Sequence, residues 1–454
     1  MKVNIHIYIY IYIYIYIYIQ EETALCLHSS RSAPHAAEKM KRFIFLCFSQ
    51  ALICAFVCGH HGGPHDDDHD HDGHHHNNEP DAMPKVATAI FDTSYKMYYQ
   101  LTATHPHDNL LFSSLSISKA FALLSLGAKS KTLSEIHEGL GFNKSSISEE
   151  MIHKGFQKLL NNIKQPKSGL QLDSITTLFI NRDLTVEKKF SDKVQKYYQS
   201  DVMPINFAEN AEALQQINSY MEKKTNGKIK DLFDNLDPMT SVVITSTIFF
   251  KGSWEHAFNV NNTREEDFHV DENTVVKVPM MSRRGEYNTG YIPEIGCTVV
   301  EVPYKGNTSA FFLLPEMGKL NDAEKASENL SEEAWNKPMK LKEIILTIPK
   351  CSISGEFDLV EVLKPLGITE VFSDHADLSG ITGDSRLKVS KAFHKAVLKM
   401  DEEGTEAVSA ATAIATTKLG PPLHVTFNRP FFFAIHNKDI SNDIFSGRIV
   451  DPTK

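Results

Sequence analysis

The segment that most constrains the fold is residues 402–422. Read at every second position from 405 to 415, it carries only small residues: Thr405, Ala407, Ser409, Ala411, Ala413 and Ala415. The positions between them also accept larger or charged residues: Glu406, Val408, Ala410, Thr412, Ile414 and Thr416. Successive side chains of a strand point to opposite faces, so one face of this segment fits a crowded interior and the other tolerates bulk. No proline interrupts residues 404–418, whereas Pro421 and Pro422 follow.

This pattern predicts an exposed loop that is able to become a central strand of a sheet. Composition alone would also fit a low-complexity Ala/Thr surface loop. The chain is long enough to build such a sheet: of 454 residues, 42% are hydrophobic and 23% are charged, as in globular proteins. The formal net charge is −10 and no dense basic block is present, which argues against a nucleic-acid partner.

Residues 85–454 contain no linker and no internal repeat, so we interpret them as one large α+β domain. We expect a helix at residues 112–126, with Ser113 or Ser116 as its N-cap. Residues 242–250 are β-branched or aromatic on both faces, which predicts a buried strand. Further strands are expected at residues 298–302, 310–314, 344–348 and 425–435, the first two joined by the polar turn Lys305-Gly306-Asn307.

A leader precedes this domain. The chain alternates Ile and Tyr over residues 7–19, as a repeated AT dinucleotide would encode, so we interpret residues 1–39 as an artefact of the gene model. A real strand of this composition would be prone to aggregation. Met40 is followed by two basic residues, an apolar stretch and Cys58-Gly59, which predicts a secretory signal peptide at residues 40–59. We therefore expect a secreted, extracellular protein with no membrane span.

The expected mature chain begins with a His/Asp-rich tail, residues 60–84. Imidazole and carboxylate groups together can bind zinc or copper, but no tetrahedral ligand spacing stands out. We therefore expect a flexible tail with weak metal affinity, no metal centre and no cofactor. The histidines of the tail are His60, His61, His65, His69, His71, His74, His75 and His76.

Cysteine and sequon usage fits a secreted glycoprotein. Only Cys297 and Cys351 remain after the signal peptide, and two free thiols are a simpler interpretation than one disulfide, which the sequence leaves open. Asn-X-Ser/Thr sequons mark expected glycosylation sites, although sequons also arise by chance. They begin at Asn143, Asn261, Asn307 and Asn329.

The sequence carries no recognisable catalytic motif. It has no Gly-X-Ser-X-Gly elbow, and His137-Glu138 lacks the second histidine of a His-Glu-X-X-His zinc motif. Gly383-Asp384-Ser385 continues without the glycines of a serine protease, and Asn226-Gly227-Lys228 lacks the upstream glycine of a phosphate loop. We therefore expect no catalytic residues and no enzyme activity.

Several short motifs occur along residues 85–454. They are Asp-Glu-Glu-Gly-Thr-Glu-Ala at 401–407, Phe-Asn-Arg-Pro-Phe at 427–431 with Phe-Ser-Gly-Arg at 445–448, Phe-Phe-Lys-Gly-Ser-Trp at 249–254, Lys-Val-Ser-Lys-Ala-Phe-His-Lys-Ala at 388–396, Asp-Phe-His-Val at 267–270 and Pro-Met-Met at 279–281. In this combination the chain resembles the serpins, most of all the alpha-1-antitrypsin branch. The first motif resembles the inhibitory hinge, the second the C-terminal signature, the third the strand that ends at the family's tryptophan, and the fourth the strand before the hinge.

The resemblance implies the serpin fold, an α+β fold with a large central β-sheet, surrounding helices and an exposed reactive-centre loop. It also implies a suicide inhibitor of serine proteases. The target cuts the loop and forms an acyl-enzyme, and the cut loop then inserts into the sheet and traps the protease. The hinge residues carried over by the resemblance are Glu402, Glu403, Gly404, Thr405, Glu406, Ala407, Val408, Ser409 and Ala410.

Counting from the hinge places the reactive bond between Lys418 and Leu419, with Pro421-Pro422 spaced as in alpha-1-antitrypsin. A lysine bait fits a protease pocket with a carboxylate at its base, so the expected partner is a trypsin-like serine protease. Counted back from Phe427, the loop is one residue longer. A bait at Leu419 would imply a chymotrypsin-like or elastase-like target.

The resemblance also assigns residues that govern loop insertion. The family's shutter, which controls opening of the sheet, matches Ser113, Ser116, Ser246 and His394. The family usually has Asn where this chain has Ser246, a shorter partner for His394 that would ease sheet opening. It usually has Pro where this chain has Ser114, which we expect to be milder.

The breach, where insertion begins, matches Trp254. Lys350 matches the partner of Glu402 in a salt bridge at the head of the loop. An exposed pair of this kind contributes only ~0–1 kcal/mol, and a desolvated one more.

The competing interpretation is a non-inhibitory serpin that carries a small hydrophobic hormone. A bulky, charged or proline-containing hinge would favour it, and residues 405–410 do not favour it, although Val408 is slightly large. A protein that binds metal through its histidine tail is a third interpretation. We expect a monomer that forms loop–sheet polymers on heating, and the absence of a dense Lys/Arg cluster gives no support for a heparin-type cofactor.

Overall fold

The computed structural model describes residues 81–142, 147–164, 170–328, 330–383, 387–402 and 422–454. The chain divides into two units, Met1–Ile44 and Phe45–Lys454, and every described residue belongs to the second. The expected leader, the expected signal peptide and the histidines of the tail lie outside the described residues.

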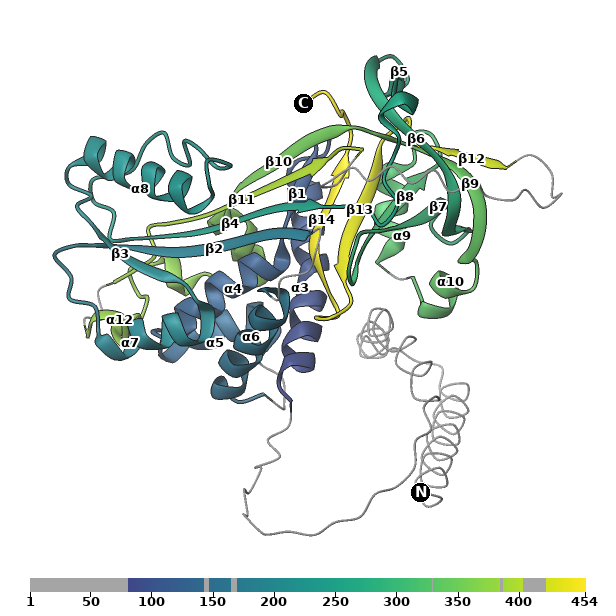
Figure 1. The fold of residues 1–454 in the computed structure, drawn as a ribbon. Coiled ribbons are helices and arrows are strands. Elements are labelled where there is room, and N and C mark those ends of the chain that lie inside the picture. The colour runs from purple at the N-terminus through teal and green to yellow at the C-terminus, as the bar shows by residue number, and fades with distance from the viewer. Residues whose placement is uncertain (1–80, 143–146, 165–169, 329, 384–386, 403–421) are drawn as a thin grey trace, which may run out of the picture. The chain divides into compact units, whose positions relative to one another are not determined.

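A five-stranded sheet forms one half of the domain (Figure 1). Its order is β10 (Cys351–Asp358), β11 (Lys391–Met400), β4 (Val242–Gly252), β2 (Leu170–Asn181) and β3 (Asp201–Ile205). β10 pairs with β11, and β2 pairs with β4, in antiparallel fashion. The central pair, β11 and β4, is parallel, and so is the short pair of β2 and β3.

A second sheet of nine strands contains the C-terminus of the chain. Its order is β1 (Leu110–Phe112), β14 (Asn442–Ile449), β13 (Phe431–Asn437), β8 (Thr308–Pro315), β7 (Cys297–Pro303), β6 (Val275–Ile292), β9 (Lys340–Pro349) and β12 (Leu423–Thr426), with β5 (Arg264–His269) paired to β6. Residues 403–421 therefore lie between the last residues after β11 in one sheet and β12 in the other.

Helices cover both faces of the five-stranded sheet (Figure 1). One face packs on α3 (Met83–Thr104), α4 (Ser114–Ser125), α5 (Ser130–Gly139), α6 (Glu149–Lys164) and α7 (Lys188–Lys193), and the other on α8 (Asn210–Lys224). The shorter helices are α9 (Leu320–Ser327), α10 (Glu332–Asn336), α11 (Leu359–Leu363) and α12 (Ser379–Thr382), with single turns at Val194–Tyr198, Val260–Asn262, Lys364–Leu366 and Glu370–Phe372. Within the described residues, no helix combines the length and the apolar character needed to cross a membrane.

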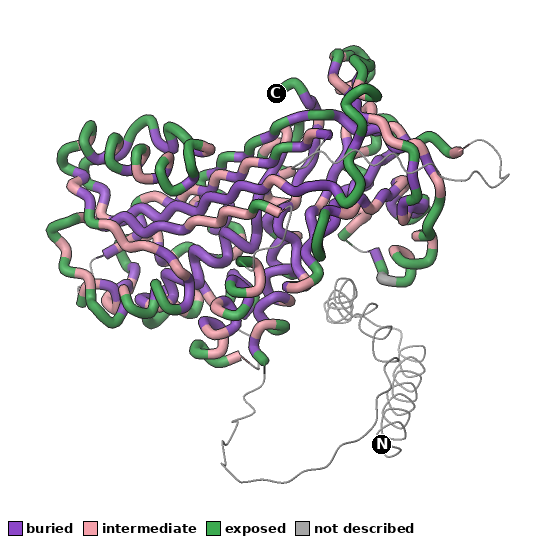
Figure 2. Tube along the Cα trace, viewed as in Figure 1, coloured by how far each residue is buried: buried purple, intermediate pink, exposed green. Residues whose placement is uncertain are grey.

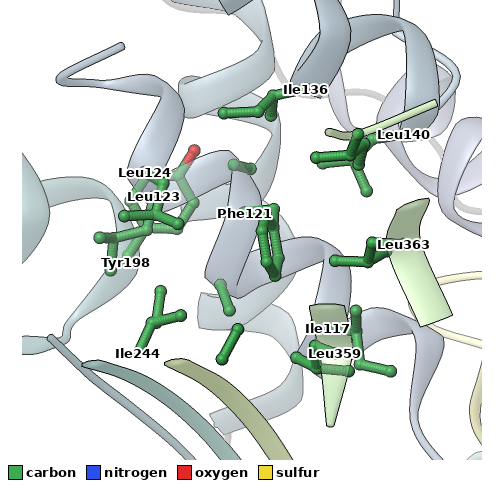
Figure 3. Close-up of a cluster of buried hydrophobic side chains, with 14 of the residues drawn as sticks. Ile117, Phe121, Leu123, Leu124, Ile136, Leu140, Tyr198, Ile244, Leu359 and Leu363 are labelled. Carbon is green, nitrogen blue, oxygen red and sulfur yellow. The ribbon is translucent and has the colours of Figure 1, made fainter. Parts of the chain in front are cut away.

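Helix α4 is the centre of the main core. All twelve of its residues are buried, as expected for a helix that is apolar or small on every side. Phe121 and Leu124 of α4 pack with Ile244 of β4 and with residues of the neighbouring helices (Figure 3). Figure 2 shows the same layer as a continuous buried band beneath the sheet. The face of α4 toward the sheet is therefore held close to the central strands.

Most expected elements are confirmed. The strand expected at residues 242–250 is β4, buried at all but one of its positions. β7, β8 and β9 contain the strands expected at 298–302, 310–314 and 344–348. The turn between β7 and β8 includes Gly306, whose φ of 89° is strained for other residues. The N-cap of α4 is Ser113, whose side chain accepts a hydrogen bond from the backbone of Ser116.

Two boundaries were wrong. Phe112 belongs to strand β1 and not to the helix, because its backbone pairs with Ser446 of β14. The single strand expected at residues 425–435 is two strands, since β12 pairs with β9 and β13 pairs with β8. Pro430 lies between them and has no N–H for a ladder bond.

Candidate functional site

The parallel pair β11 and β4 is the central feature of the candidate site. The two strands are in register from Lys391 opposite Val243 to Leu398 opposite Phe250. Because they run in the same direction, a segment that turned back from the end of β11 and entered between them would be antiparallel to both and would pair with both of their inner edges. The chain that follows β11 is the small-residue segment, and its residues 403–421 lie outside the described residues.

The four expected shutter residues meet beneath this pair. His394 of β11 lies opposite Ser246 of β4 in the strand register. The hydroxyl of Ser246 donates to that of Ser116 on α4 at 3.0 Å, and the backbone N–H of Ser113 donates to Nε2 of His394 at 3.1 Å. All four residues are fully buried. The structure therefore brings them together as one hydrogen-bonded group that ties both central strands to the start of α4.

The bonds of His394 fix its tautomer. Nε2 accepts from the Ser113 N–H, so Nδ1 carries the proton and donates to the carbonyl oxygen of Ser246 at 3.0 Å. A second proton on Nε2 would face the N–H of Ser113. Burial lowers the pKa of His394 to about 3, although the Ser246 carbonyl opposes that shift. The ring is therefore neutral, and both of its nitrogen atoms are hydrogen-bonded. It links β11 to β4 and to the start of α4.

The backbone of Ser246, more than its short side chain, provides the hydrogen-bond partner of His394. Its hydroxyl lies 3.3 Å from Nδ1 of His394, and the carbonyl of the same residue is nearer, at 3.0 Å. The principal partner of the histidine is therefore backbone, and the hydroxyl is left to bond Ser116. Ser114 is the first residue of α4, where the helix requires no backbone donor, so serine replaces proline there without loss of a helical bond.

Sequence reasoning missed two members of this group, Ser174 and Lys119. The hydroxyl of Ser116 lies 3.3 Å from that of Ser174 on β2, which extends the chain of hydroxyl groups to a third strand. The side-chain nitrogen of Lys119, one helical turn along α4, donates to the Ser174 carbonyl at 3.4 Å. A signal for Lys119 existed, because it is the only charged residue in an otherwise apolar or small helix and such a helix is buried.

A second group of contacts holds the residue at which the loop begins. Glu402 is almost fully buried, and its carboxylate accepts from the Thr263 hydroxyl at 2.8 Å and lies 2.8 Å from the Lys350 ammonium. Its carbonyl accepts from the Phe258 N–H at 2.9 Å. The expected salt bridge of Lys350 with Glu402 is present, and Thr263 and Phe258 are further partners that sequence reasoning missed.

These contacts set the charge of Glu402. Burial favours its neutral form, but the bonds from Lys350 and Thr263 outweigh burial, so the pKa of Glu402 lies below its usual range. The carboxylate is therefore ionised at neutral pH. The two partners of the ionised carboxylate and the backbone bond from Phe258 together hold Glu402 in place just after β11.

Trp254 lies at the same end of the sheet. Its Nε1 donates to the carbonyl of Asp401 at 2.9 Å, and its ring stacks on Tyr304 with centroids 4.2 Å apart. The carboxylate of Asp401 is 3.3 Å from Lys399 and 3.8 Å from Lys251. Trp254 and Lys350 thus fix two consecutive residues, Asp401 and Glu402, before the loop.

Other expected site residues are only partly described. The hinge from Glu403 to Ala410 and the bond between Lys418 and Leu419 lie outside the described residues, as do the sequons at Asn143 and Asn329. Asn261 and Asn307 are exposed, and the amide of Asn307 donates to Asp439 at 2.7 Å.

The remaining cysteines and acidic or histidine side chains give no reactive centre. Cys297 and Cys351 are free and buried, and burial raises the pKa of each thiol to about 12. In the part of the chain that the structure describes, no three Asp, Glu, His or Cys side chains are arranged to hold a metal ion.

The described residues therefore form a five-stranded sheet whose central strands β11 and β4 pair in parallel, with Glu402 held by side-chain and backbone contacts just after β11. Residues 88–452 match the family described as serpin (serine protease inhibitor). The chain belongs to the serpin family. It is thus a member of a protease-inhibitor family and not an enzyme.

Known relatives and structures agree with this assignment. Alpha-1-antiproteinase of Bos taurus is 43% identical over 381 residues, which cover 83% of this chain and 91% of that protein. The crystal structure of human glycosylated kallistatin has a TM-score of 0.75 and 38% identity, covering 82% of this chain and 99% of the other. Human thyroxine-binding globulin in complex with thyroxine has a TM-score of 0.76 and 34% identity, covering 82% of this chain and 100% of the other.

Proposed function

We propose that the protein is a secreted suicide inhibitor of a trypsin-like serine protease, with the reactive bond between Lys418 and Leu419. The observation that carries the proposal is the direct parallel pairing of β11 with β4, immediately before the loop that starts at Glu402. A segment that is small at alternate positions and free of proline suits the place between these strands.

The driving force of insertion is the ladder that the loop gains. About a dozen residues gaining hydrogen bonds at ~0.5–1.5 kcal/mol each supply on the order of 10 kcal/mol. Burial of the small side chains adds to this. A protease attached to the cut loop as an acyl-enzyme is carried along with it, which distorts its catalytic site.

In this proposal the two groups of contacts keep the sheet closed until the loop is cut. The group formed by Ser113, Ser116, Ser246 and His394 is the shutter, because opening the sheet between β11 and β4 separates His394 from Ser246. The contacts of Trp254 and Lys350 form the breach, because Glu402 must turn into the sheet for insertion to begin.

The identity of the target rests on the bait. The side chain of lysine reaches a carboxylate at the base of a deep pocket, whereas leucine at position 419 suits an apolar pocket. The relative from Bos taurus is named an antiproteinase, which supports protease inhibition. The type of protease is inferred from the residue before the reactive bond. The motif at residues 40–59 and the exposed sequons at Asn261 and Asn307 support secretion and glycosylation.

A carrier of a small hydrophobic hormone is the second candidate, favoured by the similarity to thyroxine-binding globulin solved with thyroxine. The small, proline-free hinge favours the inhibitor, because a carrier has no need of a loop that fits between two strands.

The test is incubation of residues 60–454 with trypsin, chymotrypsin and elastase, followed by a denaturing gel. The proposal predicts a denaturant-stable complex with trypsin that is lost in Lys418→Ala. A complex with only chymotrypsin or elastase, lost in Leu419→Ala, would move the bait to Leu419. Clean cleavage with no complex would overturn the inhibitor and favour the carrier.

A further inference from the structure

Lys119 is a buried lysine at the interface between α4 and the five-stranded sheet. Only 2% of the residue is exposed. Among the described residues it makes one hydrogen bond, to the Ser174 carbonyl at 3.4 Å, and no ion pair. A charged amine with one long hydrogen bond and no counter-ion is costly to bury, whereas a neutral amine is not.

The acceptor of this bond lies on a part of β2 that has one strand neighbour. β3 pairs with β2 only over residues 177–181, so residues 170–176 pair with β4 alone. Ser174 is in this stretch, and α4 contacts it twice, through the hydroxyl of Ser116 and the amine of Lys119. Lys119 thus provides a donor on the side of β2 where no strand pairs with it.

The charged groups around Lys119 do not supply a partner. Lys164 at the end of α6 repels a positive charge on Lys119, and Asp201 of β3 attracts it. The Asp201 carboxylate is already bonded to Lys224 at 2.8 Å and to the Tyr220 hydroxyl at 2.5 Å, both on α8. His394, the titratable group of the adjoining shutter, is neutral.

We propose that Lys119 is a proton-controlled support of the closed sheet: it is uncharged while β2 lies on α4 and takes up a proton when β2 moves away. In the closed sheet, the neutral amine donates to Ser174. When the two central strands separate, β4 and β2 must slide over α4, which breaks the contacts of Ser116 with Ser246 and Ser174 and admits water to Lys119. The link to loop insertion rests on the proposed function, whereas the effect on stability does not.

The direction of the pH effect follows from burial. Burial lowers the pKa of Lys119 from 10.5 to about 7, with a smaller contribution from Lys164. Between these two values the opened or unfolded chain binds a proton that the closed chain does not bind. The closed state therefore becomes more stable as pH rises from about 7 toward 10.5, and lowering the pH through this range favours opening.

The test compares the wild-type protein with Lys119→Met and with a matched control, Lys188→Met. Lys188 lies on α7 with a largely exposed side chain, so its removal should leave the pH profile unchanged. The wild-type melting temperature should rise between pH 7 and pH 9.5 by roughly 3–6 °C more than that of Lys119→Met. Heat-induced polymers of the wild type should form more slowly at pH 9.5 than at pH 7. Polymers of Lys119→Met should form at similar rates at the two pH values.

If the melting temperatures of the wild type and of Lys119→Met change in parallel with pH, the proposal is overturned. Lys119→Arg is the second variant: its permanent charge should lower the melting temperature by an amount that grows as the pH rises above about 7, which removes the same slope, and a wild-type dependence of melting temperature on pH in this variant would also overturn the proposal. These readouts need no protease. A correct pH profile in a protein that forms no protease complex would therefore refute the proposed function and leave the role of Lys119 intact.

Discussion

The ammonium of Lys350 lies 2.8 Å from the carboxylate of Glu402, two residues beyond the end of β11. The two ends of this pair differ, because the side chain of Glu402 is 4% exposed and that of Lys350 is 42% exposed. The pair therefore acts mainly on Glu402, which it keeps charged and fixed to the neighbouring elements. Moving Glu402 into the sheet requires this contact to break.

Lys350→Met removes the cation and leaves the carboxylate of Glu402 with Thr263 as its side-chain donor. We expect a loss of about 1–2 kcal/mol in the free energy of unfolding, because Glu402 is buried although Lys350 is half exposed. Polymers should also form faster on mild heating. The control is Lys277→Met, which breaks an exposed pair with Asp267 and should cost under ~0.5 kcal/mol. Equal effects of both variants in denaturant unfolding would contradict the special role of Lys350.

Ser116→Ala removes the hydroxyl that links Ser246 to Ser174. The buried hydroxyl of Ser246 and the half-buried hydroxyl of Ser174 each lose a partner, so we expect destabilisation by about 1–2 kcal/mol and faster polymer formation. Ser118→Ala is the matched control on the same helix: the Ser118 hydroxyl is buried and has no hydrogen-bond partner among the described residues, so its removal should be neutral or stabilising. Urea unfolding of both variants measures the difference, and a Ser116→Ala protein as stable as Ser118→Ala would show that the hydroxyl chain does not hold the sheet.

His394 should impose a pH dependence of its own. Its pKa is about 3 in the folded chain and 6.5 in the unfolded chain, so below pH 6.5 the unfolded state binds a proton that the folded state does not. Stability should therefore fall as pH drops from 6.5 toward 3, by at most about 5 kcal/mol from this residue. His394→Gln keeps a donor and an acceptor but does not titrate, so its stability should vary less over the same range. Guanidinium unfolding at several pH values gives both profiles, and identical slopes would contradict the assignment.

The period-two pattern of the hinge predicts opposite results at adjacent positions. Ala407→Arg puts a long cation on the face that enters the sheet, where a buried unpaired charge is costly. We expect this variant to be cleaved by trypsin without forming a stable complex. Glu406→Arg alters the other face and should still form the complex. Loss of the complex in both variants, or in neither, would show that the two faces are not assigned as the sequence predicts.

The sequence predicted the buried strand β4, but it did not predict boundaries that depend on pairing with distant strands. β4 was predictable because a strand buried on both faces reads as a continuous apolar run. The division between β12 and β13 was not, because it depends on which distant strands they pair with. The one-residue error at Phe112 has the same cause, since β14 draws that residue into a sheet.

The candidate site shows the same contrast. Ser246, His394 and Lys350 were found because the resemblance to a family assigns roles to their positions. Ser174 and Thr263 were missed because their roles depend on contacts across elements far apart in sequence. The neutral tautomer of His394 also required the positions of the Ser113 N–H and the Ser246 carbonyl, which no sequence pattern supplies.

The most direct test of loop insertion is the melting temperature of the protein after its loop is cut. A thermolysin-type zinc protease makes no acyl-enzyme, so it can cut within residues 405–419 without being trapped. If the cut loop becomes a strand between β11 and β4, the gain on the order of 10 kcal/mol should raise the melting temperature by at least about 10 °C over the intact protein. Ala407→Arg cut in the same way should show no such rise. A cut wild-type protein that melts at or below the temperature of the intact protein would contradict insertion, and with it the account of this chain as a loop-inserting inhibitor.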